Sequence, residues 1–466
     1  MKKYCYVLVF MLLTIPYSRS QEKQRSNEEI SIFDFFTSKK KQAEKKDKPV
    51  KQKKVYISAI PVISSNPVVG VAYGGVVNGA FVIGGDPKTT RFSAITLSGV
   101  YTTNEQSTLA IKNFLYFKDE KWVLQGSLNW RIFPMFTWGV GSDTPDKWAS
   151  QLENNGFSID QMLLKKVGDN WFFGGGINLN YVYEQSDNNV QHAIDYIGNS
   201  RNQDAVQFWN SIDQTLPFVI KDAQIPGSFV SDWGSQSSEA IQAKYFKTPF
   251  QLYPYGTGKS VFTNGLKVGV THDSRDNINT PRKGAYFNFN YNLYIKDFGN
   301  EENFGVGKVD YRQYFMLGSY KNVIGVRSYL VFMAGNGPYI NMPANNTDPN
   351  STGTRGIPGF RYRGDNYVSA EVEYRRHIWK FINGVVFVNA HSLSEKKEYL
   401  MAMGEPLRYD GKFRFVNPGY GLGLRFILNE KSRTTLSFDY AWNKYSFTTS
   451  KDSKRGEFYM SMNAAF

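Results

Sequence analysis

The sequence has few of the residues that carry catalysis and cross-linking in most enzymes and secreted domains. Its 466 residues include four histidines and one cysteine, Cys5. Because Cys5 lies within a predicted leader, the rest of the chain can form no disulfide and has no thiol nucleophile. The Gly-x-Ser-x-Gly and His-Glu-x-x-His motifs of hydrolases are absent as well. We therefore predict that the protein is not an enzyme and holds no cofactor, with a hydrolase built from scattered serine, histidine and aspartate residues as the minor alternative.

Long apolar runs are also missing. After residue 20 no stretch has the roughly 18 consecutive apolar residues of a membrane-spanning helix. Residues 1–20 are organised as a secretory signal peptide, with two lysines before the apolar stretch 4–15 and with Ser18 and Ser20 before a cleavage site. Because that stretch is too short to cross a bilayer core of about 30 Å, we predict a cleaved signal rather than an anchor.

Acidic residues are outnumbered by basic ones, and the excess gathers near the start of the chain. The net charge is +14, of which the signal supplies three positive residues, leaving 14 − 3 = +11. Much of it lies in residues 21–54, which are rich in lysine. We expect this segment to be a solvated periplasmic tail or to contact anionic lipid headgroups, and we expect no nucleic acid partner. An apolar island at 30–36 predicts a plug helix, a docking peptide or only a weakly ordered tail.

What the sequence does contain is a succession of short segments rich in aromatic residues and glycine. From residue 55 onward, apolar and polar residues alternate with the two-residue period of a strand. We predict about sixteen strands, at residues 55–63, 68–83, 91–103, 107–118, 121–131, 156–166, 171–183, 262–272, 284–296, 305–316, 322–333, 365–377, 384–391, 416–427, 432–443 and 456–466.

The lengths of the connections between these strands alternate. Short connections lie near residues 119–120, 167–169, 318–320, 381–384 and 429–431, and long ones at 132–155, 184–261, 334–364, 392–415 and 444–455. Short turns at one end and long loops at the other are typical of single-chain outer-membrane barrels. We therefore predict an all-β protein whose residues 55–466 form a transmembrane antiparallel β-barrel. The loop 184–261 would lie outside the cell, with weakly helical stretches at 189–197 and 204–212.

Individual strands have the two faces that such a barrel requires. Between residues 287 and 295 the odd positions are apolar, whereas Asn288, Asn290 and Asn292 lie between them. The apolar face would contact lipid and the asparagines would face the lumen. The last strand alternates in the same way and ends on Phe466, which resembles the terminal signal by which outer-membrane proteins are recognised for insertion.

Residues 353–379 combine a glycine-rich loop with a strongly two-faced strand. The loop contains Arg355 and Gly356, and the strand places Glu371 and Glu373 on its polar face. Carboxylates on this face suit either a barrel lumen or bulk water.

Residues 271–284 form a predicted polar turn between two strands. Aspartates in such a turn accept local backbone N–H bonds, proline fixes φ, and glycine permits a tight re-entry into the next strand. The residues in the turn motif are Asp273, Arg275, Asp276, Pro281 and Gly284. One neighbouring histidine and mobile carboxylates make a poor metal cluster, so we expect no metal here.

These segments together resemble the BamA/TamA-type barrels of the bacterial surface antigen superfamily. That family carries a Val-Arg-Gly-Phe or Val-Arg-Gly-Tyr motif in its sixth outer loop, of which this chain keeps Arg355 and Gly356. The turn at 271–284 is similar to a periplasmic turn that recurs in the family. Further similar segments lie at 384–390, 419–426 and 436–440.

The resemblance implies that the loop folds into the lumen, where its arginine meets an acidic residue. At the position of the family's aspartate this chain has Asn389, which carries no charge. We therefore expect Glu371 or Glu373 to supply the charge that a desolvated guanidinium needs. The alternative is that Arg355 lies exposed at a loop tip.

Membership in this family implies insertion or translocation of proteins or lipids at the outer membrane of a Gram-negative bacterium. The implied partners are outer-membrane lipids, client outer-membrane proteins and a periplasmic or outer-membrane protein. The family normally carries POTRA domains before the barrel, and residues 21–54 are too short to hold one, so we expect a barrel-only member. A passive pore or a structural barrel is the alternative function.

Closing the barrel requires the first and last strands to meet. Pro61 lies in the first strand and cannot donate a ladder hydrogen bond. We expect this seam to be weak, and in the resembled family a weak seam opens sideways so that a client strand can pair with the edge. The alternative is a simple bulge near the barrel rim.

Overall fold

The computed structural model describes residues 31–32, 55–66, 70–84, 93–117, 121–141, 144–277, 279–345, 354–357, 359–394, 413, 416–429, 433–443 and 456–462. The predicted signal at 1–20, all but two residues of the lysine-rich segment 21–54, and the terminal Phe466 lie outside the described residues.

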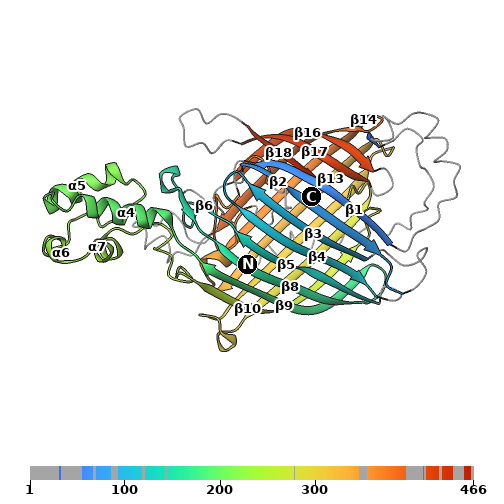
Figure 1. The fold of residues 1–466 in the computed structure, drawn as a ribbon. Helices are drawn as coiled ribbons and strands as arrows, with labels where there is room; N and C mark the ends of the chain where they lie inside the picture. The colour runs from blue at the N-terminus through green and yellow to red at the C-terminus, as the bar shows by residue number, and fades with distance from the viewer. Residues whose placement is uncertain are drawn as a thin grey trace.

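A single antiparallel sheet of sixteen strands, each paired with the next along the chain, curls into a barrel (Figure 1). The predicted fold class is confirmed, and each predicted strand is present. The strands are β1 (Val55–Asn66), β2 (Gly70–Phe81), β3 (Ser93–Thr102), β4 (Ser107–Tyr116), β5 (Trp122–Ile132), β8 (Asn155–Lys166), β9 (Trp171–Glu184), β10 (Val261–Asp273), β11 (Gly284–Tyr294), β12 (Phe304–Met316), β13 (Asn322–Gly335), β14 (Asn366–Trp379), β15 (Ile382–Ser394), β16 (Asn417–Asn429), β17 (Thr434–Asn443) and β18 (Glu457–Met462).

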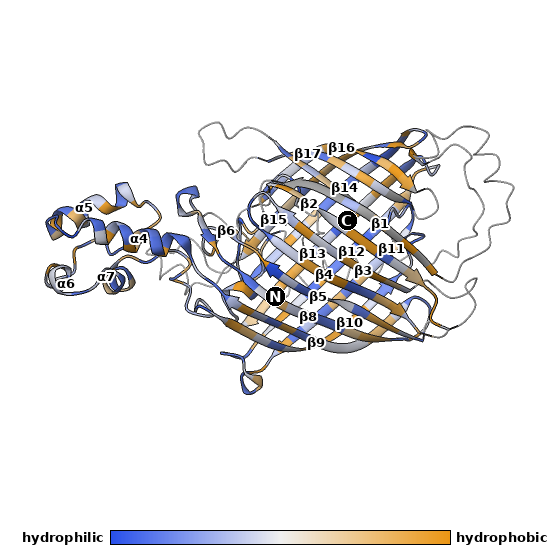
Figure 2. Ribbon diagram, viewed as in Figure 1, coloured by the Kyte–Doolittle hydropathy of each residue, from blue (hydrophilic) through white to orange (hydrophobic). Residues whose placement is uncertain are grey.

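The wall of the barrel reverses the polarity of a soluble protein. Along β14 the side chain of Val372 is 42% exposed, whereas Glu371 and Glu373 on either side of it are 1% and 0% exposed. Apolar and polar residues alternate along the strands around the wall (Figure 2). A sheet in water buries its apolar face, so an apolar outer face around a polar lumen is the pattern of a barrel surrounded by lipid.

Consecutive antiparallel pairing places the connections alternately at the two ends of the barrel. The long connections after β5, β9 and β13 share one end, which carries the helices at the left of Figure 1. The short turns 317–321, after β12, and 380–381, after β14, share the opposite end. We call these the loop end and the turn end.

Two long connections contain structure of their own. The β5–β8 connection includes the hairpin of β6 (Met135–Thr137) and β7 (Ser150–Leu152), which the sequence did not predict. The β9–β10 connection holds four helices, of which the first two were predicted. They are α4 (Asn188–Asn199), α5 (Ala205–Thr215), α6 (Phe229–Ser235) and α7 (Ser238–Tyr245).

The four helices form a module with its own hydrophobic core. Its centre includes Phe208, Trp209, Phe229 and Phe246, which are 2% exposed or less. The α6 and α7 helices have only seven and eight residues, so they depend on this packing rather than on intrinsic helix propensity. Within the described part of the chain, no helix has the length and apolar character needed to cross a membrane.

The first and last strands of the sheet lie side by side, as Figure 1 shows. Among the residues that the structure describes, no ladder of paired residues joins β1 to β18. The described part of β18 is six residues long and pairs with β17. The first and last strands therefore come into contact, while in the described residues each remains an edge of the hydrogen-bonded sheet.

A matched pair of substitutions tests whether the wall faces lipid. Val388, near the middle of β15, is 55% exposed, and Val206, in the helical module, is 45% exposed. Val388→Lys should lower the free energy of unfolding in phospholipid vesicles by about 2–4 kcal/mol, because lysine is costly at the bilayer midplane. Val206→Lys should change it by less than about 0.5 kcal/mol, since that side chain faces water. Urea titration of the two variants measures both values, and equal losses would contradict a lipid-facing wall.

Candidate functional site in the barrel lumen

The loop between β13 and β14 spans residues 336–365. Its residues 354–357 lie in the lumen and touch the barrel wall through glycines. Gly356 has φ of +93°, a left-handed conformation that favours glycine. A Cβ atom on Gly356 would lie 3.0 Å from the carbonyl oxygen of Trp442, on β17. On the wall, a Cβ atom on Gly419 would lie 2.8 Å from the carbonyl oxygen of Arg355. Glycine on both surfaces therefore lets the loop backbone contact β16 and β17 directly.

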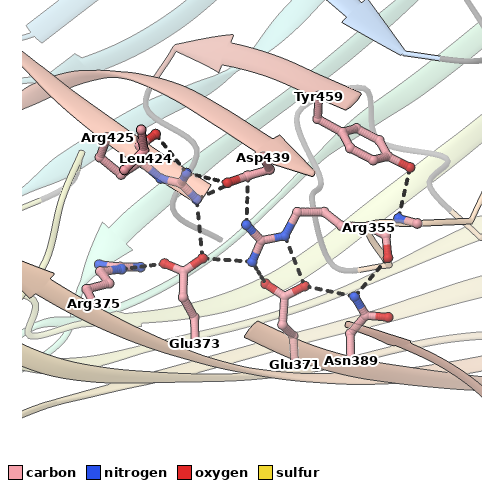
Figure 3. A network of polar contacts seen from close by, with 10 residues as sticks. Arg355, Glu371, Glu373, Arg375, Asn389, Leu424, Arg425, Asp439 and Tyr459 are labelled. Carbon is pink, nitrogen blue, oxygen red and sulfur yellow. Dashed lines mark hydrogen bonds and ion pairs between the residues drawn. The ribbon is translucent and has the colours of Figure 1, made fainter. Parts of the chain in front are cut away.

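The side chain of Arg355 ends in a cluster of buried carboxylates. Its Nη2 atom lies 2.5 Å from Glu371 Oε1 and 2.7 Å from Glu373 Oε2, and its Nη1 atom lies 2.8 Å from Asp439 Oδ2 (Figure 3). The guanidinium also lies over the ring of Phe387, with Cζ 3.4 Å from the ring centroid. Arg355 is 1% exposed. The predicted alternative, an arginine exposed at a loop tip, does not describe this placement.

Two further arginines balance the charge of this cluster. Arg375 Nε lies 2.5 Å from Glu373 Oε1, and Arg425 Nη1 lies 2.5 Å from Asp439 Oδ1. Together with Arg355, they place three guanidinium groups among the three carboxylates of Glu371, Glu373 and Asp439. We call these six residues the lumen network. Because each charge has a partner of opposite sign at hydrogen-bonding distance, the cost of burying it is offset.

The electrostatic state of Arg355 follows from this arrangement. Burial alone would lower the pKa of its guanidinium, but attraction to Glu371, Asp439 and Glu373 raises that pKa above its usual value. Arg355 therefore stays charged and acts as a permanent electrostatic anchor for the loop.

Asn389 supports the loop in a different way from an acidic residue. Its Nδ2 atom donates a hydrogen bond of 3.0 Å to the carbonyl oxygen of Arg355 and one of 3.4 Å to Glu371 Oε2. The residue thus holds the backbone of the loop rather than the guanidinium. Glu371 and Glu373 both contact Arg355, and Asp439 of β17 supplies the third carboxylate.

Sequence reasoning missed Asp439 although its strand carried a usable signal. Asp439 is the only acidic residue between Thr434 and Asn443. Its neighbours Phe438 and Tyr440 lie on the outer face of the strand, so Asp439 lies on the inner face. An acidic residue on the polar face of a barrel strand is expensive to leave unpaired. That cost, rather than motif similarity, would have identified it as a partner for a lumen arginine.

The loop also holds the last strand. The backbone N–H of Gly356 donates a 2.9 Å hydrogen bond to the hydroxyl oxygen of Tyr459, and this hydroxyl donates a 2.5 Å bond to Glu457 Oε2. Tyr459 and Glu457 both belong to β18, one of the two edges at the seam. We call this pair of bonds the β18 clasp. Sequence reasoning did not identify it, since it joins residues 103 positions apart.

The polar turn at the turn end is held by its own aspartates. Asp273 accepts bonds of 2.9 Å from both Nε and Nη2 of Arg275. Asp276 Oδ1 accepts a 2.8 Å bond from the backbone N–H of Arg282. Gly284 has φ of +98°, and a Cβ atom there would clash with the backbone of Ser274.

This turn also contacts other parts of the barrel. The carbonyl oxygen of Pro281 accepts a 3.0 Å bond from Arg375 Nη1, which links the turn to the lumen network. Asp276 Oδ2 lies 2.7 Å from Arg433 Nη1, beside the turn between β16 and β17. A continuous set of polar contacts therefore runs from Arg355 of the long loop to the turn end of the barrel.

At the loop end, three connections pack into a common cap. Its buried apolar residues come from the β6–β7 hairpin, the end of the helical connection and the loop 336–365, and they include Met135, Phe250, Tyr253, Tyr339, Met342 and Ile357. Arg361 donates a 2.6 Å bond to the carbonyl oxygen of Thr144, and Arg363 donates a 2.7 Å bond to that of Tyr339. These connections thus form one packed layer across the strand ends.

Comparison with known proteins agrees with this architecture. A family model described as the Omp85 superfamily domain matches residues 93–466. A crystal structure of BamA from Haemophilus ducreyi lacking POTRA domains 1-3 is similar, with a TM-score of 0.51 and 13% identity over 88% of this chain and 70% of that chain.

Two further similar structures are of CdiB. CdiB from Escherichia coli has a TM-score of 0.50 and 10% identity, and CdiB from Acinetobacter baumannii has a TM-score of 0.46 and 12% identity. The chain spans 63% and 60% of their lengths, less than two thirds of each, and they cover 88% of this chain. At such identities the likeness concerns the fold. No curated protein sequence matches the chain.

Removing the central guanidinium should destabilise the barrel strongly. Arg355→Ala leaves three buried carboxylates with two arginines, and an uncompensated buried charge costs about 3–5 kcal/mol. The control, Arg433→Ala, removes a half-exposed ion pair with Asp276 and should cost no more than about 1 kcal/mol. Equilibrium unfolding in vesicles measures both losses, and a similar small loss in each variant would refute a structural role for the lumen network.

An acidic residue at position 389, as in the resembled family, should lower the free energy of unfolding of this protein. Asn389→Asp removes the donor to the Arg355 carbonyl oxygen and places a second carboxylate beside Glu371, so we expect a loss of about 1–3 kcal/mol. Asn389→Ser, which also removes the amide donor but adds no charge, should cost less. Unchanged or increased stability of Asn389→Asp in the same unfolding assay would show that the site accepts a fourth carboxylate.

Proposed function

Because the chain belongs to the Omp85 superfamily, we propose that it assists the insertion or translocation of proteins or lipids at the outer membrane of a Gram-negative bacterium. The observation that carries the proposal is the seam, where β1 and β18 lie side by side without a ladder between them in the described part of the chain. The proposal assigns the chain no catalytic step. Its partners would be client outer-membrane proteins, the surrounding lipids and a periplasmic or outer-membrane protein that delivers the clients.

A seam without a ladder in its described residues supports this function, because strand edges present backbone donors and acceptors. A client segment in extended form can add to such an edge by main-chain hydrogen bonds, with little dependence on its sequence. The edge strand β1 contains Pro61, in register with Gly75 of β2. Because proline has no backbone N–H, it cannot donate a hydrogen bond to a neighbouring strand, and this weakens strand pairing at that position.

The β18 clasp gives the seam a connection to the loop. Gly356 holds Tyr459 of β18, and Arg355 next to it anchors the loop in the lumen network. Movement of the loop would therefore change the support of one edge of the seam. This coupling supports an edge that opens in a controlled way.

A passive pore is the alternative, and a polar cavity in the lumen favours it. The cavity has a volume of about 490 Å³ and is lined by residues that include Lys112, Gln125, Asp160 and Lys267. The packed cap at the loop end argues against free passage through it. Single-channel recording of the intact protein separates the two functions, since a pore gives a stable open conductance whereas a capped barrel gives none until the loop 336–365 is deleted.

Locking the seam should block the proposed function. A disulfide joining facing cysteines in β1 and β18 prevents the edges from separating, so cells depleted of the native protein should lose outer-membrane proteins or lipids when only the locked variant is present. The control is a disulfide across a paired ladder, between Ser58→Cys of β1 and Asn78→Cys of β2, which are partners in the register of the two strands. This control should retain activity, and addition of a reducing agent should restore the activity of the locked variant. Full activity of the locked variant, with its disulfide shown to be formed, would overturn lateral opening.

A further inference from the structure

A small basic pocket lies at the turn end, beside the lumen network but outside its carboxylates. It has a volume of about 40 Å³. Four cationic side chains line it, from two turns and two strands: Arg282, Lys321, Arg375 and Arg425. None of the residues that line the pocket is acidic.

The two arginines at the inner side of the pocket are fixed in place. Arg375 is held by Glu373 at 2.5 Å and by the carbonyl oxygen of Pro281 at 3.0 Å. Arg425 is held by Asp439 at 2.5 Å and by Glu373 at 3.4 Å. Because each guanidinium is fixed by these contacts, the two arginines form a preorganised cationic part of the pocket lining.

The outer side of the pocket is built by the turns. The guanidinium of Arg282 lies over the ring of Tyr320, with Cζ 5.0 Å from the ring centroid. The backbone N–H of the same residue donates a hydrogen bond to Asp276, which holds the backbone of the turn at this point. Lys321 follows Tyr320 at the end of the neighbouring turn. Both Arg282 and Lys321 are half-buried, and so they can be reached from the turn end.

The charged side chains that line the pocket all have the same sign. Among the described residues, its lining holds four cations and no carboxylate. A pocket with such a lining at the mouth of the lumen attracts anions.

The size of the pocket limits what it can hold. A water molecule needs about 10–15 Å³ of such volume, so the pocket has room for about three waters or for one compact oxyanion. Guanidinium groups match phosphate oxygens with paired N–H donors, and lysine adds a point charge. We propose that this pocket binds a phosphate group, from either inorganic phosphate or a phosphorylated lipid headgroup at the turn end of the barrel.

Calorimetry on the full-length protein in neutral detergent tests the proposal, with inorganic phosphate titrated at constant ionic strength against a chloride blank. We expect saturable binding that Arg282→Gln combined with Lys321→Gln weakens at least about tenfold, since the double variant removes two charge-assisted contacts to the anion. The control pairs Lys147→Gln with Lys296→Gln, two exposed lysines of the long connections at the other end. It should leave the affinity unchanged.

A second arm separates the two sources of phosphate. In nanodiscs of phosphatidylcholine alone, inorganic phosphate should bind as in detergent. If nanodiscs containing phosphatidic acid suppress that binding, the headgroup is the occupant, and if they do not, the free anion is. Both outcomes support the pocket. Absence of saturable binding to the native protein, or equal affinity in the double variant with its barrel shown to be folded, would overturn the proposal. The measurement needs no client protein, so it stands apart from the proposed function at the seam.

Discussion

The ion-paired burial of one guanidinium is the constraint on which the interior of this barrel depends. Arg355 carries a permanent charge into a lumen where it is 1% exposed, and three carboxylates from β14 and β17 compensate it. Removing either sign would leave the other in a low-dielectric environment without a partner. The loop, the two strands and their neighbouring arginines therefore form one unit whose parts are stable only together.

The same constraint explains the small residues on the facing surfaces. The Arg355 side chain reaches β14 and β17 only because the loop backbone contacts the wall, and Gly356 and Gly419 make that contact possible. Asn389 then satisfies the carbonyl oxygen that the contact would otherwise bury without a donor. The ion pairs of the guanidinium and the hydrogen bond of the loop backbone thus occur at one place, where the backbone must approach the wall closely. This explains why a glycine follows the arginine in the loop.

Most of the fold could be predicted because a barrel strand is a local pattern. Alternation with period two and the alternating lengths of the connections identify all sixteen strands without any knowledge of distant contacts. The helices α6 and α7 and the β6–β7 hairpin are different, because such short elements exist only through packing against other segments. Their sequences carry no periodic signal of sufficient length.

The candidate site was predictable only in part for a related reason. Glu371 and Glu373 could be proposed as partners because they lie close to Arg355 in the sequence and on a polar face. Asp439 and Tyr459 lie 84 and 103 residues from their partners in the loop, and only the curvature of the wall brings them together. Asn389 carries no charge, and the third carboxylate comes from Asp439 on another strand, which a motif defined along the chain does not detect.

The position of the loop beside the seam links the lumen network to the proposed function. Adjacent residues of one loop have different partners, since Arg355 binds the wall and Gly356 binds β18 through Tyr459. The wall contact involves several charged pairs, whereas only one bond of the β18 clasp joins the loop to the strand, from the Gly356 N–H to the neutral hydroxyl of Tyr459. Such a bond contributes far less free energy than the charged pairs. A force on the loop or on the edge would therefore break the clasp before the anchor. An edge that can be released while its anchor stays in place is what a barrel needs if it is to admit a client strand and then close again.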